Sequence, residues 1–212
     1  MSENIRRQLI ETALEMNNSG INQGTAGNLS IRHDGGMLIT PSGMAYASLE
    51  TADIVFVDSS GAHHGARLPS SEWRIHHDIY QARPDSMAIL HAHPTNCAAL
   101  ACLHLAIPAF HYMVAVAGGP DIRCAPYATF GTQELSDGVL QALQGRKACL
   151  MANHGMICLA DGLGQALSLA IEVEHLAQTY RHCLAIGQPT ILDGEEMDRV
   201  LLKFKSYGVQ QD

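Results

Sequence analysis

The chain has 212 residues, of which 47% are hydrophobic and 16% charged, and its net charge at pH 7 is −8. A domain of this length buries roughly 70% of the surface that its unfolded chain exposes, so we expect a single domain, residues 1–212. The negative charge gives no general attraction for nucleic acid or an anionic membrane, and no apolar stretch reaches about 18 residues. We therefore expect a cytoplasmic protein that binds neither nucleic acid nor membrane.

The cysteines favour a reduced protein without disulfides. Six are scattered along the chain without a CxxC pair, at Cys97, Cys102, Cys124, Cys149, Cys158 and Cys183. This distribution fits buried thiols better than a disulfide framework or a thiolate metal site. We expect these residues to serve packing.

The N-terminal part predicts a helix followed by strands. Apolar residues recur at helical spacing over residues 3–18, at Ile5, Leu9, Ala13 and Met16. Residues 28–32 and 36–40 flank an Asp-Gly pair that favours the positive φ of a tight turn, which predicts a β-hairpin. A further strand is expected at residues 54–57.

The rest of the chain mixes helices with short apolar runs. Helices are expected at residues 71–83, 95–105, 132–143, 163–186 and 193–205, the last behind a capping-box pattern of Asp193 and Glu196. Strand candidates are residues 87–91, 113–117, 148–152 and 156–159. No βαβ rhythm repeats and no Gly-rich phosphate loop opens a helix after a strand. This organisation favours an α/β fold with a largely antiparallel sheet covered by helices.

Two histidines in "LHAHPTN" (90–96) form a candidate metal site. Side chains two residues apart in a strand share a face, about 6–7 Å apart at the backbone, so His91 and His93 project together. Two imidazole nitrogens can then approach one ion to about 2.0–2.1 Å while Ala92 points away. The pattern also arises by chance in a chain with 12 histidines, so alone it does not establish a metal site.

His154 in "MANHGMICL" is a third candidate. It stands between two apolar runs, and Gly155 beside it indicates a turn or strand end that faces a cleft. Three neutral imidazoles with an open position are typical of catalytic zinc, because a structural zinc is closed by four ligands. The other histidines lack such an arrangement and are expected to be surface or packing residues: His33, His63, His64, His76, His77, His104, His111, His175 and His182.

Three polar stretches could hold an anion. In "LPSSEWRIHHDIY", Ser70 and Ser71 stand at the expected start of a helix, where amides and hydroxyls attract a negative charge. The alternative is ordinary N-capping by Ser71, with Glu72 favouring the first helical turn. "TAGN" (25–28) and "TPSG" (40–43) offer similar donors, but each could equally be a turn.

Seven motifs follow one another along the chain: "NQGTAGNLS", "LITPSG", "LPSSEWRIH", "HAH", "IPAFHYM", "CAPYATFGT" and "NHG". In this order they resemble the class II aldolases of the L-fuculose-1-phosphate aldolase type. The resemblance extends from the first helix to "KFKSYG" near the C-terminus. Each motif is weak alone, but the set is highly specific, and it implies a three-layer α/β/α fold with a largely antiparallel central sheet.

The resemblance implies a zinc enzyme. In that family the histidines of His-x-His and of the later His-Gly bind zinc, and these match His91, His93 and His154. The glutamate after Ser-Ser, both a resting metal ligand and the acid/base, matches Glu72. One Zn2+ per subunit is therefore expected, and Mn2+ or Co2+ could replace it.

The resemblance also implies where the substrate binds. The family's phosphate cradle matches Gly27, Asn28, Ser42, Gly43, Ser70 and Ser71, with Ser42 in place of a threonine. The side chains that shape the aldehyde end match Tyr112, Phe130 and Tyr207. The family is homotetrameric with sites between subunits, so Tyr112 is expected to serve a neighbour's zinc.

The expected reaction is cleavage of the C3–C4 bond of a ketose 1-phosphate, which leaves the enediolate of dihydroxyacetone phosphate. A Lewis-acid metal stabilises this negative charge, so no Schiff-base lysine is required. We hypothesise that Tyr112 takes the proton from the C4 hydroxyl and that Glu72 later protonates the enediolate carbon.

Related activities remain as alternatives. Pentulose-phosphate epimerases of the superfamily carry Asp after Ser-Ser, so Glu72 favours aldol cleavage, whereas methylthioribulose-1-phosphate dehydratases retain the glutamate. A non-catalytic metal-binding protein is a remote alternative. The sequence does not decide among L-fuculose 1-phosphate, 5-deoxyribulose 1-phosphate and 5-methylthioribulose 1-phosphate as the substrate.

Overall fold

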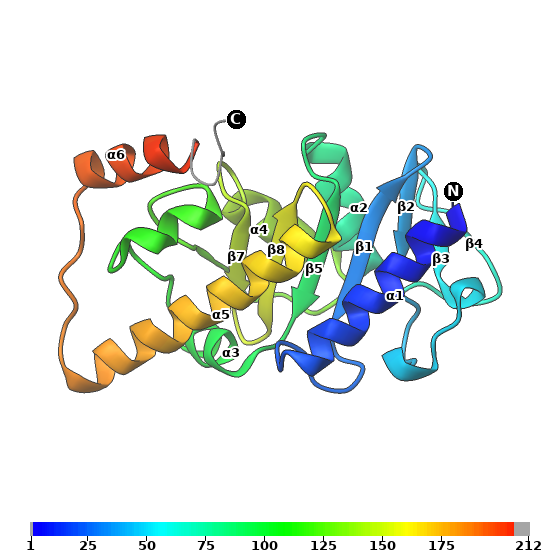
Figure 1. Cartoon of the computed structure of the whole chain (residues 1–212), viewed down its shortest axis with the longest axis horizontal. Helices are drawn as coiled ribbons and strands as arrows, with labels where there is room; N and C mark the ends of the chain where they lie inside the picture. The colour runs from blue at the N-terminus through cyan, green and yellow to red at the C-terminus, as the bar shows by residue number, and fades with distance from the viewer. Residues whose placement is uncertain (1, 206–212) are drawn as a thin grey trace, which may run out of the picture.

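An eight-stranded sheet runs through the part of the chain that the computed structural model describes, residues 2–205 (Figure 1). The strand order is β4-β3-β2-β1-β5-β8-β7-β6. The strands are β1 (Asn28–His33), β2 (Gly36–Ile39), β3 (Val55–Val57), β4 (His63–His64), β5 (Ala88–Ala92), β6 (Cys124–Ala125), β7 (Ala148–Met151) and β8 (Gly155–Ala160).

The sheet is mixed, because six neighbouring pairs are antiparallel and the pair β6–β7 is parallel. The expectation of a largely antiparallel sheet is confirmed. The predicted hairpin is β1–β2, whose turn places Asp34 and Gly35 at φ 44° and 74°. The two short strands β4 and β6 were not predicted, since two-residue segments carry no periodicity.

Six α-helices and three short 3-10 helices accompany the sheet in the described residues. The α-helices are α1 (Ser2–Asn18), α2 (Trp73–Ala82), α3 (Thr95–Cys102), α4 (Gln133–Ala142), α5 (Leu163–Ile186) and α6 (Gly194–Phe204). The 3-10 helices are η1 (Tyr46–Ser48), η2 (Thr51–Asp53) and η3 (Tyr112–Ala117). None of the helices between residues 2 and 205 combines the length and hydrophobicity that a membrane crossing requires.

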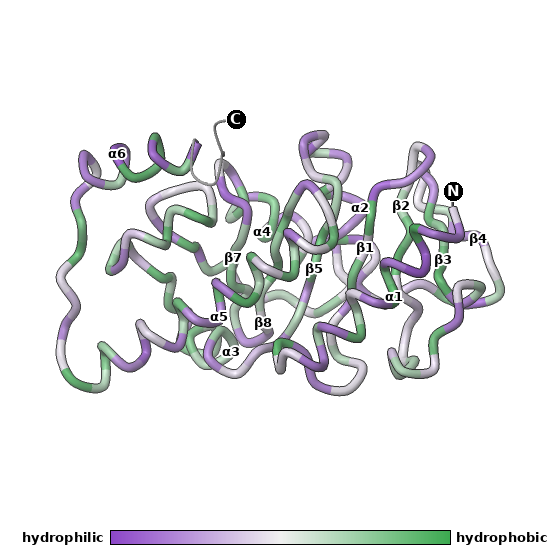
Figure 2. The backbone as a smooth tube through the Cα atoms, viewed as in Figure 1, coloured by the Kyte–Doolittle hydropathy of each residue, from purple (hydrophilic) through white to green (hydrophobic). Residues whose placement is uncertain are grey.

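Helices pack on both faces of the sheet. All five residues of β5 are buried, and successive side chains enter different clusters. Leu90 belongs to the cluster formed with α1, α3 and α5, whereas Ile89 belongs to the one formed with α2 and α4. At the edge of the molecule α6 alternates between hydrophilic and hydrophobic residues (Figure 2), and it buries Met197 and Val200.

One predicted strand is wrong. Residues 113–117 form most of η3, in which Val114, Ala115 and Ala117 are buried. The helix is bounded locally, because His111 Nδ1 accepts a hydrogen bond from the Met113 amide (3.3 Å) and Gly118 follows at φ 87°. A run of five apolar residues is too short for its periodicity to distinguish a strand from a buried helix.

Candidate active site

Four side chains from three segments of the chain converge beside the end of β5. Glu72 precedes α2 and His91 lies in β5. His93 follows β5, and His154 lies in the turn between β7 and β8. One ligand atom of each side chain lies within 4.8 Å of those of the other three. We call these residues the His/Glu cluster.

The imidazoles of the His/Glu cluster face one another and the carboxylate. His91 Nε2 lies 2.8 Å from His93 Nε2 and 3.0 Å from Glu72 Oε2. His154 Nε2 lies 3.3 Å from Glu72 Oε1. His91 and His93 thus share a face, as the spacing of two residues predicts.

Burial and charge prepare these groups to bind a cation. Burial and the neighbouring His91 lower the pKa values of His93 and His154 to about 4, so both imidazoles are neutral at neutral pH. Burial raises the pKa of Glu72, but the adjacent His91, His154 and Asn28 outweigh it and hold that pKa well below its usual range. Burial lowers the pKa of His91, but the adjacent Glu72 and the Met156 carbonyl outweigh it and raise that pKa. His93 and His154 as neutral imidazoles, beside an ionised carboxylate, are donors of the kind that a divalent metal requires.

Two further observations fit a divalent cation. His91 Nδ1 lies 2.8 Å from the carbonyl oxygen of Met156, and donation to that oxygen leaves the Nε2 lone pair facing the cluster. Glu72 Oε1 is buried and has no hydrogen-bond partner among residues 2–205. A buried carboxylate oxygen without a donor is costly unless a cation binds it. The donor set therefore fits a divalent metal.

Glycine at position 155 lets the histidines approach. A Cβ atom there would lie 2.4 Å from the Ala92 carbonyl oxygen and 2.7 Å from His93 Cδ2. The preceding turn holds Asn153 at φ 53°, a left-handed conformation that asparagine tolerates. The "NHG" sequence therefore combines a tight turn, a candidate ligand and space for the ring of His93.

Glu72 does not cap a helix in the ordinary way. Helix α2 begins at Trp73, and Glu72 occupies the N-cap position without a side-chain capping bond. Its amide donates to Ser70 Oγ at 3.3 Å, and its carboxylate turns toward the imidazoles. N-capping by Ser71 is therefore not observed.

Of the residues expected to cradle phosphate, Asn28 contacts the Glu72 carboxylate directly. Asn28 lies opposite His91 in the β1–β5 pairing, and its Nδ2 donates to Glu72 Oε2 at 3.1 Å. The Ser42 amide donates to the Leu68 carbonyl (3.1 Å), which aligns the segment of Ser42 and Gly43 with the segment that ends in Ser70 and Ser71. Gly27 is buried, and a Cβ atom there would lie 2.7 Å from the carbonyl oxygen of His91.

Two of the residues expected at the aldehyde end, Tyr112 and Phe130, are exposed. Tyr112 in η3 is 52% exposed and lines a cavity of about 490 Å³ with α6. Phe130 is 61% exposed. None of the contacts of the His/Glu cluster described above, all within residues 2–205, involves Tyr112 or Phe130. Tyr207 lies outside the described residues.

His76 was expected to be a surface or packing residue, but it is a buried polar neighbour of the cluster. Its Nε2 lies 2.6 Å from Asn28 Oδ1, and its Nδ1 lies 2.7 Å from Ser30 Oγ. Two spacings could have revealed this. His76 follows Glu72 by one helical turn, and Asn28 and Ser30 alternate with apolar residues in β1.

Comparisons with known proteins show which family the chain resembles. Residues 7–181 match the family model described as Class II Aldolase and Adducin N-terminal domain. The 5-methylthioribulose-1-phosphate/5-deoxyribulose-1-phosphate aldolase of Rhodospirillum rubrum is 56% identical over 204 residues, covering 96% of this chain and 92% of the relative. The L-fuculose phosphate aldolase of Escherichia coli is 53% identical over 207 residues, covering 97% and 96%.

A solved structure described as L-fuculose 1-phosphate aldolase superposes with a TM-score of 0.93 at 42% identity, covering 95% of this chain and 96% of that one. The match therefore extends over nearly the whole chain. The chain belongs to the class II aldolase family.

Proposed function

We propose that the protein is a zinc-dependent aldolase that reversibly cleaves a ketose 1-phosphate to dihydroxyacetone phosphate and an aldehyde. The observation that carries the proposal is the His/Glu cluster, with a buried carboxylate oxygen free of hydrogen bonds among the described residues. Relatives named for L-fuculose phosphate and for 5-deoxyribulose 1-phosphate support a ketose 1-phosphate as the substrate.

The side chains of His91, His93, His154 and Glu72 would hold one Zn2+. The bound ion would act as a Lewis acid toward the negative charge that develops when the C3–C4 bond breaks. Burial of His91 and Glu72 strengthens these electrostatic interactions, because little water screens them.

Glu72 would transfer the proton at the enediolate carbon. Its Oε2 already accepts a hydrogen bond from Asn28, so Oε1 is the oxygen left to carry the proton. Tyr112 of a neighbouring subunit would accept the proton of the C4 hydroxyl. This role would account for the exposed position of Tyr112, which makes none of the described contacts of the cluster in its own chain.

The substrate phosphate would bind to donors beside Glu72. The segments that supply Ser42, Gly43 and Ser71 are exposed, whereas Gly27, Asn28 and Ser70 are buried behind them. Hydroxyl and backbone N–H groups can hold a phosphate without a lysine. Phe130 and Tyr207 would shape the pocket for the aldehyde half.

We further propose that residues 1–212 act as one domain of three-layer α/β/α type in a cytoplasmic homotetramer with active sites between subunits. Helices on both faces of the sheet support the layer arrangement. The exposed Tyr112, which the cluster of its own chain does not use, supports a shared site.

The substitution Glu72→Gln tests this function. Turnover of a ketose 1-phosphate should fall at least about a hundredfold, because a general acid–base group contributes 10²–10⁴-fold. Dihydroxyacetone phosphate would be scored by a coupled assay, and bound zinc by elemental analysis. Glu11→Gln, an exposed change on α1, is the matched control and should keep wild-type activity.

Two results would refute the aldolase proposal. One is near-normal turnover by Glu72→Gln, and the other is undiminished turnover by wild-type protein after thorough chelation. The same assay with L-fuculose 1-phosphate, 5-deoxyribulose 1-phosphate and 5-methylthioribulose 1-phosphate would rank the aldehyde halves by kcat/KM.

A further inference from the structure

A chain of buried polar side chains lies behind Glu72. Asn28 and Ser30 come from β1, and His76 and Tyr80 come from α2. All four are buried, and His76 and Ser30 are completely inaccessible to solvent. Polar groups buried to this degree are almost always hydrogen-bonded, and a connected set next to a reactive carboxylate points to a role in holding it.

The contacts form one continuous path. Tyr80 OH lies 2.9 Å from Ser30 Oγ, and Ser30 Oγ lies 2.7 Å from His76 Nδ1. His76 Nε2 lies 2.6 Å from Asn28 Oδ1, and Asn28 Nδ2 lies 3.1 Å from Glu72 Oε2. The path therefore connects the middle of α2 to the carboxylate at its start through two residues of β1.

The chemistry of the groups permits one direction of donation along this path. The ionised carboxylate of Glu72 only accepts, so Asn28 must present its NH2 group to Glu72 and its carbonyl oxygen to His76. His76 then carries its proton on Nε2 and accepts at Nδ1 from the Ser30 hydroxyl. The Ser30 oxygen in turn accepts from the Tyr80 hydroxyl at 2.9 Å, which is nearer than the Met87 carbonyl oxygen at 3.4 Å. Every donor in the path thus points toward Glu72.

A neutral imidazole is required at the centre of this path, and its surroundings keep it neutral. Burial, together with the nearby His91, lowers the pKa of His76 to about 3. A protonated His76 would donate from both nitrogens and could not accept the Ser30 hydroxyl proton at 2.7 Å. With Nδ1 accepting from the Ser30 hydroxyl, His76 presents Nε2–H to Asn28 Oδ1 and so helps to hold the amide in the orientation that donates to Glu72.

We propose that His76 is a positioning residue for the reaction, which orients Asn28 so that the amide holds Glu72 Oε2 and leaves Oε1 toward His154. His76 itself touches neither metal nor substrate. The inference rests on the proposed role of Glu72. A carboxylate free to rotate would divide its time between productive and unproductive orientations, so loss of the path lowers kcat rather than weakening phosphate binding.

The pair His76→Gln and His76→Asn tests this inference. A glutamine carboxamide reaches about as far as Nε2 and can still donate to Asn28, whereas the shorter asparagine reaches only as far as Nδ1. His76→Gln should keep kcat within about threefold of wild type, and His76→Asn should lower it about 10–100-fold, with KM changed less than about twofold. Equal kcat values for the two variants, or a change confined to KM, would overturn the inference.

Zinc binding gives a readout that needs no substrate. Competition of metal-free protein with a chromogenic chelator for Zn2+ should show His76→Asn binding about tenfold or more weakly than His76→Gln, because the carboxylate ligand is no longer held. Equal affinities would contradict the positioning role. A wild-type protein that cleaves no ketose 1-phosphate refutes the proposed function but leaves this comparison valid.

Two more variants separate positioning from stability. His77→Asn changes the adjacent histidine, which contacts Ser59 and Asp78, and should lower the melting temperature while kcat and Zn2+ affinity stay unchanged. Should His76→Asn not fold, Ser30→Ala removes only the hydroxyl that fixes the tautomer, and should lower kcat about three- to tenfold. Folded Ser30→Ala protein with wild-type kcat and Zn2+ affinity would also overturn the inference.

Discussion

Gly155 shows how one missing side chain shapes the His/Glu cluster. Its Cα faces the ring of His93 and the backbone of β5, and an added methyl group would lie closer to both than atoms in proteins normally do. The close approach of β8 to His93 therefore depends on glycine here. This requirement is steric, because no positive φ is involved.

We predict that Gly155→Ala lowers the free energy of unfolding by about 1–3 kcal/mol, the usual cost of overpacking, and weakens Zn2+ binding as His93 shifts. Chemical denaturation and chelator competition would measure the two effects. Gly164→Ala is the matched control, because a Cβ atom there meets nothing within 4 Å and alanine favours a helix. Unchanged Zn2+ affinity in Gly155→Ala would contradict the steric account.

Residue spacing predicted some members of the cluster and not others. The period of two in a strand places His91 and His93 together, and Gly155 marks His154 as a turn residue. Nothing local singles out Glu72, since a glutamate near a helix start is common, and only the family resemblance gave it a role. His76 was not identified because its partners in β1 are 46 and 48 residues away in the sequence.

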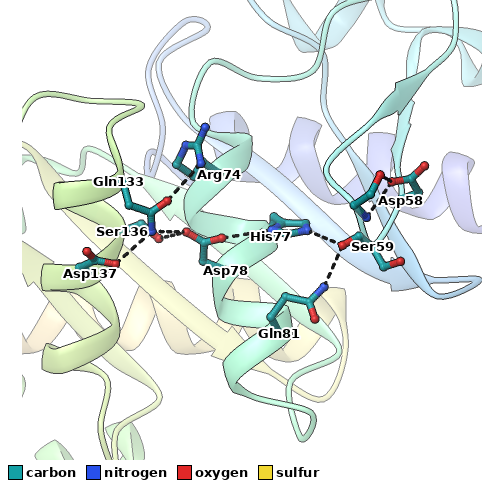
Figure 3. Close-up of polar contacts among 10 residues, drawn as sticks. Asp58, Ser59, Arg74, His77, Asp78, Gln81, Gln133, Ser136 and Asp137 are labelled. Atoms are coloured by element: carbon teal, nitrogen blue, oxygen red, sulfur yellow. Dashed lines mark hydrogen bonds and ion pairs between the residues drawn. The ribbon is translucent and has the colours of Figure 1, made fainter.

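At the scale of elements, a polar network joins α2 to α4 on the side of the sheet that carries Glu72 (Figure 3). Asp78 of α2 accepts from Ser136 Oγ at 2.6 Å and from Gln133 Nε2 at 3.0 Å, both in α4. The neighbouring His77 lies 3.1 Å from Asp78 Oδ1 and from the carbonyl oxygen of Ser59, which extends the contact toward the β3–β4 connection.

The charge of Asp78 makes this contact depend on pH. Burial raises the pKa of Asp78, but donors from Ser136, His77 and Gln133 outweigh it, so the pKa is lowered from 3.8. A lowered pKa means that the folded state prefers the ionised form. Its stabilisation is therefore complete above about pH 5 and is lost as the pH falls from there through the folded-state value below 3.8.

Asp78→Asn should accordingly lower the free energy of unfolding by about 1–2 kcal/mol at pH 7, since hydrogen bonds to a charged acceptor are lost. The difference from wild type should shrink toward pH 3. Urea denaturation at both pH values would measure it, with the exposed Asp198→Asn in α6 as the control. If the difference in unfolding free energy between Asp78→Asn and wild type stays constant down to pH 3, the ionised form of Asp78 is not its source.

The elements differ in how far local sequence determines them. Asp193 caps α6 as its pattern predicts, because its side chain accepts from the Glu196 amide at 2.8 Å. Helix α3 depends on a distant residue, Glu174 of α5, whose carboxylate accepts from the amides of Asn96 and Cys97 at 2.9 Å each. A cap 77 residues away leaves no local signal. Residues 113–117 were predicted incorrectly as a strand for another reason, since the run is too short to show a helical period although His111 and Gly118 bound η3 locally.

At the scale of the whole molecule, the exposed Tyr112, which makes none of the described contacts of the His/Glu cluster, gives a test of shared active sites. If each site takes Glu72 from one subunit and Tyr112 from its neighbour, inactive Glu72→Gln and Tyr112→Phe subunits complement each other. Random mixing would then rebuild about a quarter of the sites in a symmetric oligomer.

We expect co-refolding of the two inactive variants to restore measurable release of dihydroxyacetone phosphate. The control mixes Glu72→Gln with a chain that carries both substitutions, which contains no intact Glu72 and should stay inactive. If the mixture of the two single variants is as inactive as each variant alone, Tyr112 does not belong to a shared site.

The alignment of β1 with β5 has a consequence for how the protein matures. Asn28 lies opposite His91, and a slip of one residue in this pairing would turn one strand over, so that the side chain of Asn28 or of His91 would face α5 instead of Glu72. A chain with this shifted register would be as compact as the native protein but would lack the ligand arrangement that binds the ion. Only molecules with the correct β1–β5 register would then bind the metal ion. Metal binding would thus distinguish correctly paired molecules from those with a shifted register.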